Sequence, residues 1–171
     1  VDFAHGAKQR GIRVLIDLVV NHTSHKHPWF QDARRDPTSP YRDWYVWSKE
    51  KPDNADQGMV FPVVQKTTWT RDTVAGQYYF HRFYDFQPDL NTSNPHVQAE
   101  ILKIMGFWIQ LGVSGFRMDA VPFLVEKKGA GIEHQHVDSV FILRRGSQVG
   151  GLTHRQRLDH RHTELAADIG G

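Results

Sequence analysis

The sequence predicts an α/β fold with a parallel sheet, because helical and strand-like segments alternate along its first 131 residues. Residues 1–11 have helical spacing, and residues 12–22 form a nearly continuous apolar run of the kind found in strands buried on both faces. A second helix is predicted at about 94–112 and a second strand at about 113–121. Strands joined through a helix pair in parallel by a right-handed crossover, so both are expected in one sheet.

Local signals support each element in turn. Gly11 ends the first helix, and Asp17 alone interrupts the first apolar strand. In the second helix Asn94 is a suitable N-cap and Pro95 fits the first helical position. One apolar stripe runs along that helix, which Gly112 closes; its members are Val97, Ile101, Ile104, Met105, Trp108 and Leu111.

The segment between the two predicted strands is too long for a simple connection. From His22 to about Pro88 it is polar and contains all five Tyr and four of the five Trp. Such a segment is typical of a functional insertion. We expect most of its aromatic side chains to form the core of a small subdomain, with stacking against a ring-shaped ligand as the alternative; they are Trp44, Tyr45, Trp47, Trp69, Tyr78, Tyr79 and Tyr84.

Composition excludes several classes of protein. The 21 Lys and Arg nearly balance the 19 Asp and Glu, and no basic run exists, so nucleic acid is not an expected partner. No apolar window is long enough for a membrane span. The absence of cysteine excludes disulfides and thiolate chemistry and is compatible with a cytoplasmic location, which we predict, since no signal segment follows Val1.

Polar residues follow both predicted strands, and the carboxyl ends of parallel strands carry catalytic groups in α/β barrels. They are Asp17, Asn21 and His22 on the first strand and Arg117 and Asp119 on the second. Strand alternation places Arg117 and Asp119 on one face, where the guanidinium would keep Asp119 ionised, as a carboxylate nucleophile must be. The alternative is a buried salt bridge that only fixes the sheet.

Two further groups contain residue types that bind metal ions in proteins. His22, His25 and His27 have no zinc-site spacing, so we do not expect a zinc site. The amide oxygen of Asn21 is a ligand type that Ca²⁺ accepts, although it could equally bond to its own turn.

Three motifs in order make the chain similar to the α-amylase superfamily of glycoside hydrolases and transglycosidases. DLVVNH at 17–22 resembles the motif ending barrel strand 3, QPDLN at 87–91 the motif near the end of the inserted subdomain, and GFRMDAV at 115–121 the strand 4 motif. The sequence around these motifs most resembles the trehalose synthase branch. The resemblance implies part of a (β/α)₈ TIM barrel with a small subdomain, about 23–90, inserted after strand 3.

The resemblance also implies roles for individual residues. Asp119 would be the nucleophile of a retaining reaction and Arg117 would orient it. His22, Asp17 and Gln87 would bind or support the sugar. A structural calcium site would be built from Asn21, Asp89, Phe123, Leu124 and Glu126; Phe123 replaces the usual Tyr, which is harmless if the main-chain carbonyl is the ligand.

The sequence also departs from the family. The second carboxylate, the general acid/base on strand 5, is missing, and the resemblance fades after residue 131. Residues 132–171 hold one aromatic residue, Phe141, and five of the 11 histidines. We interpret them as a non-homologous tail, through frameshift or truncation, with a polar surface tail as the alternative.

The function predicted from these observations is that of a fragment of an enzyme that isomerises maltose to trehalose by glucosyl transfer. The isolated chain is expected to be inactive. The alternatives are an α-glucosidase or oligo-1,6-glucosidase, and a non-catalytic remnant that binds carbohydrate or calcium. The expected partner is therefore maltose or a related α-glucoside, and the oligomeric state is left open.

Overall fold

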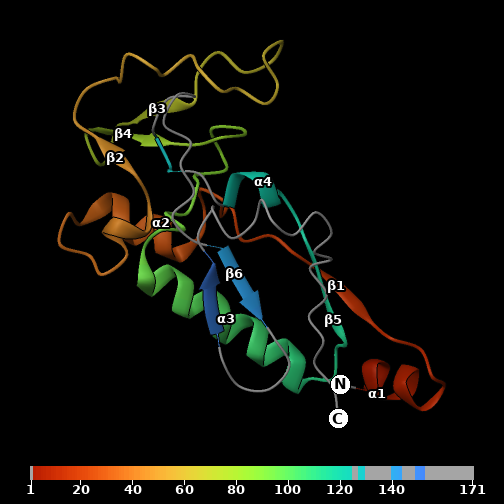
Figure 1. Ribbon diagram of the computed structural model, residues 1–171. Coiled ribbons are helices and arrows are strands. Elements are labelled where there is room, and N and C mark those ends of the chain that lie inside the picture. Colours follow the sequence, from red (N-terminus) through yellow and green to blue (C-terminus); the bar gives the residue numbers. More distant parts are fainter. Residues whose placement is uncertain (1, 125–126, 130–139, 144–148, 153–171) are drawn as a thin grey trace.

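The computed structural model describes residues 2–124, 127–129, 140–143 and 149–152. Its central feature is a pair of parallel strands, β1 (Leu15–Leu18) and β5 (Gly115–Met118), which lie side by side in Figure 1. The register pairs Asp17 with Arg117 and Leu18 with Met118. Helix α1 (Asp2–Gln9) precedes β1, and Gly11 closes it at a φ of 70°. The predicted α/β fold with a parallel strand pair is therefore confirmed.

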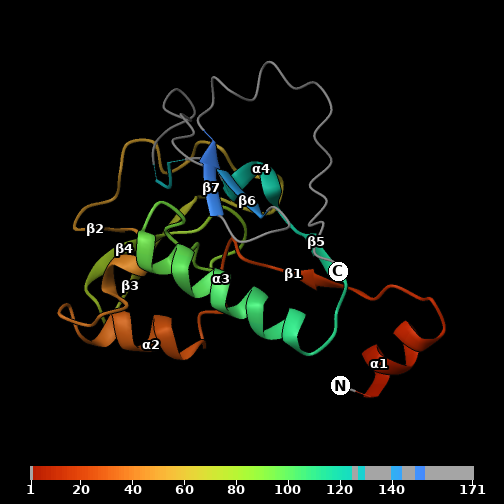
Figure 2. The same ribbon diagram turned by 60° about the horizontal axis from the view of Figure 1, so that its bottom comes forward.

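Helix α3 (Pro95–Gln110) makes the crossover to β5 (Figure 2) and begins as the sequence predicts. The Asn94 side chain accepts a hydrogen bond from the backbone N–H of His96 at 2.9 Å, and Pro95 follows it. The apolar stripe packs at its N-terminal half, where Val97 and Ile101 are buried, whereas Trp108 is 38% exposed. Gly112 ends the helix at a φ of 99°.

The strand pair is less buried than predicted. Leu15 is 63% exposed, and Asp17 is also exposed, whereas Leu18 is buried. Within the described residues β1 and β5 pair only with each other, so each has one edge without a strand partner. The prediction of a strand buried on both faces is therefore wrong here: its apolar character agrees with a larger sheet, but the described residues do not surround it.

Residues 22–90 lie to the left of and above the strand pair in Figure 1. They contain α2 (Pro28–Arg35), the 3₁₀ helix η1 (Arg42–Trp44) and an antiparallel sheet ordered β2-β4-β3, with β2 at Trp47–Ser48, β3 at Trp69–Asp72 and β4 at Gln77–Phe80. Phe30 lies at the centre of an aromatic cluster, with ring centroids 5.0 Å from Tyr45 and 5.1 Å from Tyr79. Most of the aromatic residues named above thus lie in a core, but the main cluster also includes Leu18 of β1 and Val97 of α3, so that core is not the insert's alone.

The two ends of this insert run antiparallel and hold each other. Thr23 donates its backbone N–H to the carbonyl of Pro88 at 3.1 Å, and Leu90 donates to the carbonyl of Asn21 at 2.8 Å. Isolated bridges join His22 to Asp89 and Tyr45 to Leu90. The insert therefore begins and ends at the carboxyl end of β1, which brings residues 65 or more positions apart to one place.

The last described elements follow β5. Helix α4 (Val121–Leu124) comes directly after Asp119 and Ala120, and a separate antiparallel hairpin joins β6 (Val140–Leu143) to β7 (Val149–Leu152). The apolar patch at 140–143 is thus a strand that pairs with β7, and the other residues of the predicted tail, 132–139, 144–148 and 153–171, lie outside the described residues. No helix in the described part of the chain has the length and apolar character that crossing a membrane requires.

Candidate active site

Three charged residues meet at the carboxyl ends of the parallel strands. Arg117 lies between two carboxylates: its Nη1 is 3.2 Å from Oδ1 of Asp17, and its Nη2 is 3.7 Å from Oδ1 of Asp119. The backbone N–H of Asp119 donates to the carbonyl of Leu18 at 3.2 Å, which extends the parallel ladder to this point. The predicted juxtaposition of Asp17, Arg117 and Asp119 is therefore present, from two strands of one sheet.

These side chains are accessible to solvent. The side chains of Asp17 and Arg117 are each 65% exposed, and that of Asp119 is 45% exposed. The alternative of a buried structural salt bridge is therefore wrong. Exposed ion pairs contribute only about 0–1 kcal/mol to stability, so the cluster contributes little to folding and is free to meet a ligand.

The backbone turns sharply after Asp119. Ala120 has a φ of 55°, the only positive φ among non-glycine residues in the part of the chain that the structure describes. An L-residue in this region costs roughly 1–2 kcal/mol because Cβ approaches the following carbonyl. This conformation lets α4 begin immediately, with Phe123 donating its N–H to the carbonyl of Ala120 at 3.0 Å, and leaves Asp119 at the tip of the strand.

His22 and Gln87 come together from opposite ends of the insert. Gln87 Nε2 lies 3.0 Å from His22 Nε2, and Asn21 Nδ2 lies 3.4 Å from His22 Nδ1. Burial lowers the pKa of His22, and the charge of Lys128 lowers it further, whereas Asp89 and Asp119 raise it. Amide nitrogens only donate, so they too disfavour a ring with two N–H groups. The imidazole is therefore held neutral and half-buried.

An open hollow of about 430 Å³ adjoins these two residues. It is lined by Val19, His22, Thr23, Ser24, Phe86 and Gln87. Asp119, Arg117 and Asp17 do not line it. The predicted sugar-binding residues thus fall into two groups, with His22 and Gln87 at the hollow and Asp17 beside Arg117.

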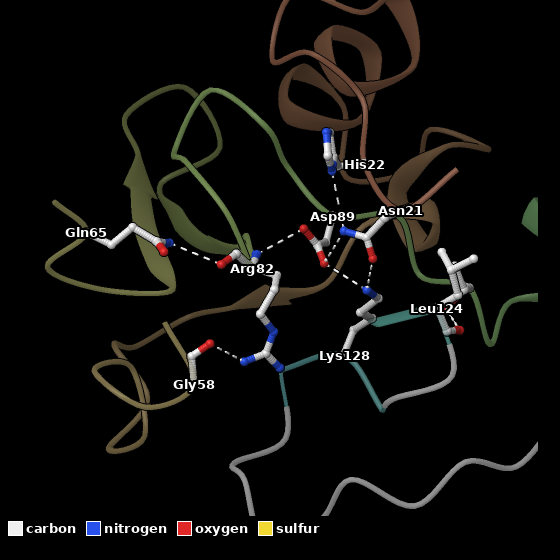
Figure 3. Close-up of polar contacts among 9 residues, drawn as sticks. Asn21, His22, Gly58, Gln65, Arg82, Asp89, Leu124 and Lys128 are labelled. Carbon is white, nitrogen blue, oxygen red and sulfur yellow. Dashed lines mark hydrogen bonds and ion pairs between the residues drawn. The ribbon is translucent and has the colours of Figure 1, made fainter. Parts of the chain in front are cut away.

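Behind His22 lies a buried polar network, shown in Figure 3. Asp89 Oδ2 accepts from Asn21 Nδ2 at 3.0 Å, and Asp89 Oδ1 accepts from the backbone N–H of Arg82 at 2.9 Å. The Lys128 ammonium donates to Asn21 Oδ1 at 2.5 Å and to Asp89 Oδ2 at 2.8 Å. The side chains of both Lys128 and Asp89 are 0% exposed.

This arrangement differs from the predicted calcium site. Asn21 and Asp89 do converge, and Phe123 and Leu124 lie in α4, but the Leu124 carbonyl accepts from the Thr92 hydroxyl at 2.9 Å. Glu126 lies outside the described residues. A lysine ammonium only donates and cannot ligate a cation, and here it takes the oxygens that Ca²⁺ would need. The described side chains therefore do not fit a calcium ion.

Lys128 is the residue that sequence reasoning missed. It stands in a polar KKG stretch beside the exposed Lys127, and no periodicity marks one of the two as buried. Its partners are 107 and 39 positions away in the sequence. The one signal that bore on it was the Asp89 carboxylate, which needs a positively charged partner if it is buried.

Comparisons with known proteins identify the family of this chain. The model of the alpha-amylase catalytic domain matches residues 2–161, a range that runs beyond residue 131. A trehalose synthase of Pimelobacter sp. is 51% identical over 132 residues, which are 77% of this chain and 23% of the relative. A glucan 1,6-alpha-glucosidase of Streptococcus dysgalactiae is 44% identical over 123 residues, 72% of this chain and 22% of the relative.

Solved structures give the same result. The trehalose-6-phosphate hydrolase of Bacillus licheniformis superimposes with a TM-score of 0.66 at 37% identity, over 73% of this chain and 23% of that one. The chain spans about a quarter of the length of the curated relatives it matches. On the family model and the relatives, this chain belongs to the alpha-amylase catalytic-domain family.

Proposed function

We propose that this chain carries the nucleophile half of the active site of a retaining enzyme that transfers α-glucosyl groups, with maltose as donor and trehalose as product. The observation that supports the proposal is the position of Asp119, which follows β5, lies beside Arg117 and donates its backbone N–H to Leu18 of the parallel strand that leads to His22. The similarity to a trehalose synthase supports the choice of substrate.

In the proposed step, the Asp119 carboxylate attacks the anomeric carbon of the donor glucosyl unit. A bond forms from the carboxylate oxygen to that carbon, the glycosidic C–O bond breaks, and the leaving oxygen must be protonated. Arg117 keeps Asp119 charged and oriented, and the neutral His22 and the Gln87 amide beside it line the hollow where they can contact the sugar. The ester is then resolved by attack of a hydroxyl.

The described residues include no acid placed to protonate the leaving group. The glutamates among them are Glu50, which is exposed after β2, and Glu100, which pairs with Lys103 on α3 at 2.9 Å. General acid catalysis is worth about 10²- to 10⁴-fold. We therefore propose that the 171-residue chain alone does not turn over maltose.

A glucosyl donor whose leaving group needs no proton tests the nucleophile directly. We expect α-D-glucosyl fluoride to glucosylate Asp119 slowly, seen as one added glucosyl unit in the intact mass and located by peptide mapping. Asp119→Asn should abolish the label, whereas Asp85→Asn, which changes a carboxylate of the insert, should retain it. Absence of the label, or a label on another residue, would contradict the proposed role of Asp119.

Hydrolysis is the second candidate, and the exposure of the strand-end cluster favours it. With 45% of the Asp119 side chain exposed, water can reach the ester, whereas an isomerase must hold the released glucose in a closed site. The similarity to a glucan 1,6-alpha-glucosidase also supports it. Product analysis separates the two: an enzyme containing this chain that forms trehalose from maltose is the isomerase, and one that forms glucose alone is the hydrolase.

A further inference from the structure

Among the described residues, the ammonium of Lys128 is unusual because it is fully buried. Its side chain is 0% exposed, and its Nζ lies 2.5 Å from Asn21 Oδ1 and 2.8 Å from Asp89 Oδ2 (Figure 3). Lysine is almost never fully buried unless its charge is paired. The Asp89 carboxylate supplies that pair and is itself 0% exposed, so the two charges neutralise each other inside the protein.

The ammonium joins three separate segments of the chain. Asn21 follows β1, Asp89 ends the insert, and Lys128 follows α4. Asp89 also accepts hydrogen bonds from Asn21 Nδ2 and from the backbone N–H of Arg82, so both of its carboxylate oxygens are hydrogen-bonded. A cation at this point therefore fixes the place where the insert leaves and rejoins the strand pair.

A divalent ion and this ammonium cannot share the site. Ca²⁺ requires 6–8 oxygens at about 2.3–2.6 Å, and two positive charges this close to one carboxylate would repel each other in a region with little water to screen them.

We propose that Lys128 is a built-in cation: its ammonium supplies, between Asn21 and Asp89, the positive charge that the family resemblance assigns to Ca²⁺. The junction of insert and strand pair is then stable without calcium, and this chain does not bind calcium there. The inference concerns stability and metal binding and does not rest on the proposed sugar chemistry.

The test uses the 171-residue chain in EGTA and in millimolar Ca²⁺, with thermal unfolding as one measurement and Tb³⁺ luminescence as the other. The unmutated chain should melt at the same temperature in both conditions and show no saturable Tb³⁺ binding at this junction. Lys128→Glu replaces the cation with a carboxylate, so it should melt about 10 °C lower in EGTA and recover at least half of that loss in Ca²⁺.

Lys127→Glu is the matched control, because it makes the same charge change at an exposed neighbouring position. It should leave the melting temperature unchanged and independent of calcium. Should Lys128→Glu fail to fold in either condition, the unmutated chain decides: calcium-independent melting without Tb³⁺ binding supports the proposal.

Two results would overturn the proposal. One is stabilisation of the unmutated chain by Ca²⁺ that Asp89→Asn abolishes. The other is saturable Tb³⁺ binding that Ca²⁺ displaces and Asp89→Asn removes. Any Tb³⁺ binding that Asp89→Asn leaves unchanged lies elsewhere and counts as no binding at this junction, which supports the proposal.

Discussion

Breaking the Asp89–Lys128 pair should have a large effect on folding, and the structure sets its size. At 2.8 Å the two charges attract with about 6 kcal/mol at an effective dielectric constant of 20, and desolvation of both groups offsets much of this gain. Removing one partner breaks this ion pair and leaves the other charge buried without it. Asp89→Asn and Lys128→Met should therefore each lower the free energy of unfolding by about 3–5 kcal/mol.

The double variant distinguishes a paired charge from two independent contributions. The double variant has lost both charges of the pair. Its loss of unfolding free energy should therefore be smaller, by about 1–3 kcal/mol, than the sum of the losses in the two single variants. Urea unfolding followed by circular dichroism measures all four proteins. The calculation requires equal urea dependence of the unfolding free energy across them, since a changed slope would indicate a changed unfolded state.

An exposed pair in the same chain is the control. Lys103 and Glu100 on α3 lie 2.9 Å apart, with side chains 73% and 30% exposed. A cycle of Lys103→Met and Glu100→Gln should give a coupling of about 0.5 kcal/mol or less. Strict additivity at Asp89 and Lys128, or a coupling no larger than that of the exposed pair, would refute the argument that burial makes this pair important.

Three further predictions concern single residues. Asn94→Ala removes the cap of α3 and should lower the urea midpoint by an amount equivalent to about 1 kcal/mol, whereas Asn94→Asp should retain most of the stability. Ala120→Gly relieves the left-handed conformation and should stabilise the chain by about 0.5–1 kcal/mol; a destabilised variant in urea unfolding would refute the strain. Burial lowers the pKa of His81 below its ordinary 6.5. As the pH falls, the unfolded chain protonates this histidine at a higher pH than the folded chain does, so the free energy of unfolding is full above about pH 6.5 and falls below it. His81→Gln should make the loss of unfolding free energy between about pH 7.5 and pH 5.5 smaller. An unchanged pH dependence of the unfolding free energy would contradict this.

The backbone elements were predictable because their signals are local. Asn94 and Pro95 mark the start of α3 within two residues, and Gly11 and Gly112 stop helices at positive φ. The parallel pairing of β1 with β5 followed from the order of elements. Strand alternation also placed Arg117 beside Asp119, which the ion pair at 3.7 Å agrees with.

Burial was predicted less well, because it depends on neighbours far away in sequence. The apolar run around Leu15 favours a strand with both faces covered, yet in the described structure Leu15 is 63% exposed. Lys128 shows the opposite difference: its residue type predicts a surface position, yet its side chain is fully buried. Local sequence patterns indicate whether a side chain tends to be buried, whereas its actual burial depends on contacts with residues 39 or 107 positions away in the sequence.

The buried polar network and the candidate active site are connected through Asn21. The Asn21 amide faces both ways: its Oδ1 accepts from Lys128 at 2.5 Å, and its Nδ2 lies 3.0 Å from Asp89 and 3.4 Å from the His22 ring. Rotation of that amide would therefore move His22. Since His22 also contacts Gln87 at 3.0 Å, the ring is held from both ends of the insert. Loss of the Lys128 charge should thus disturb sugar binding at His22 as well as stability, although Lys128 itself, fully buried, touches no ligand.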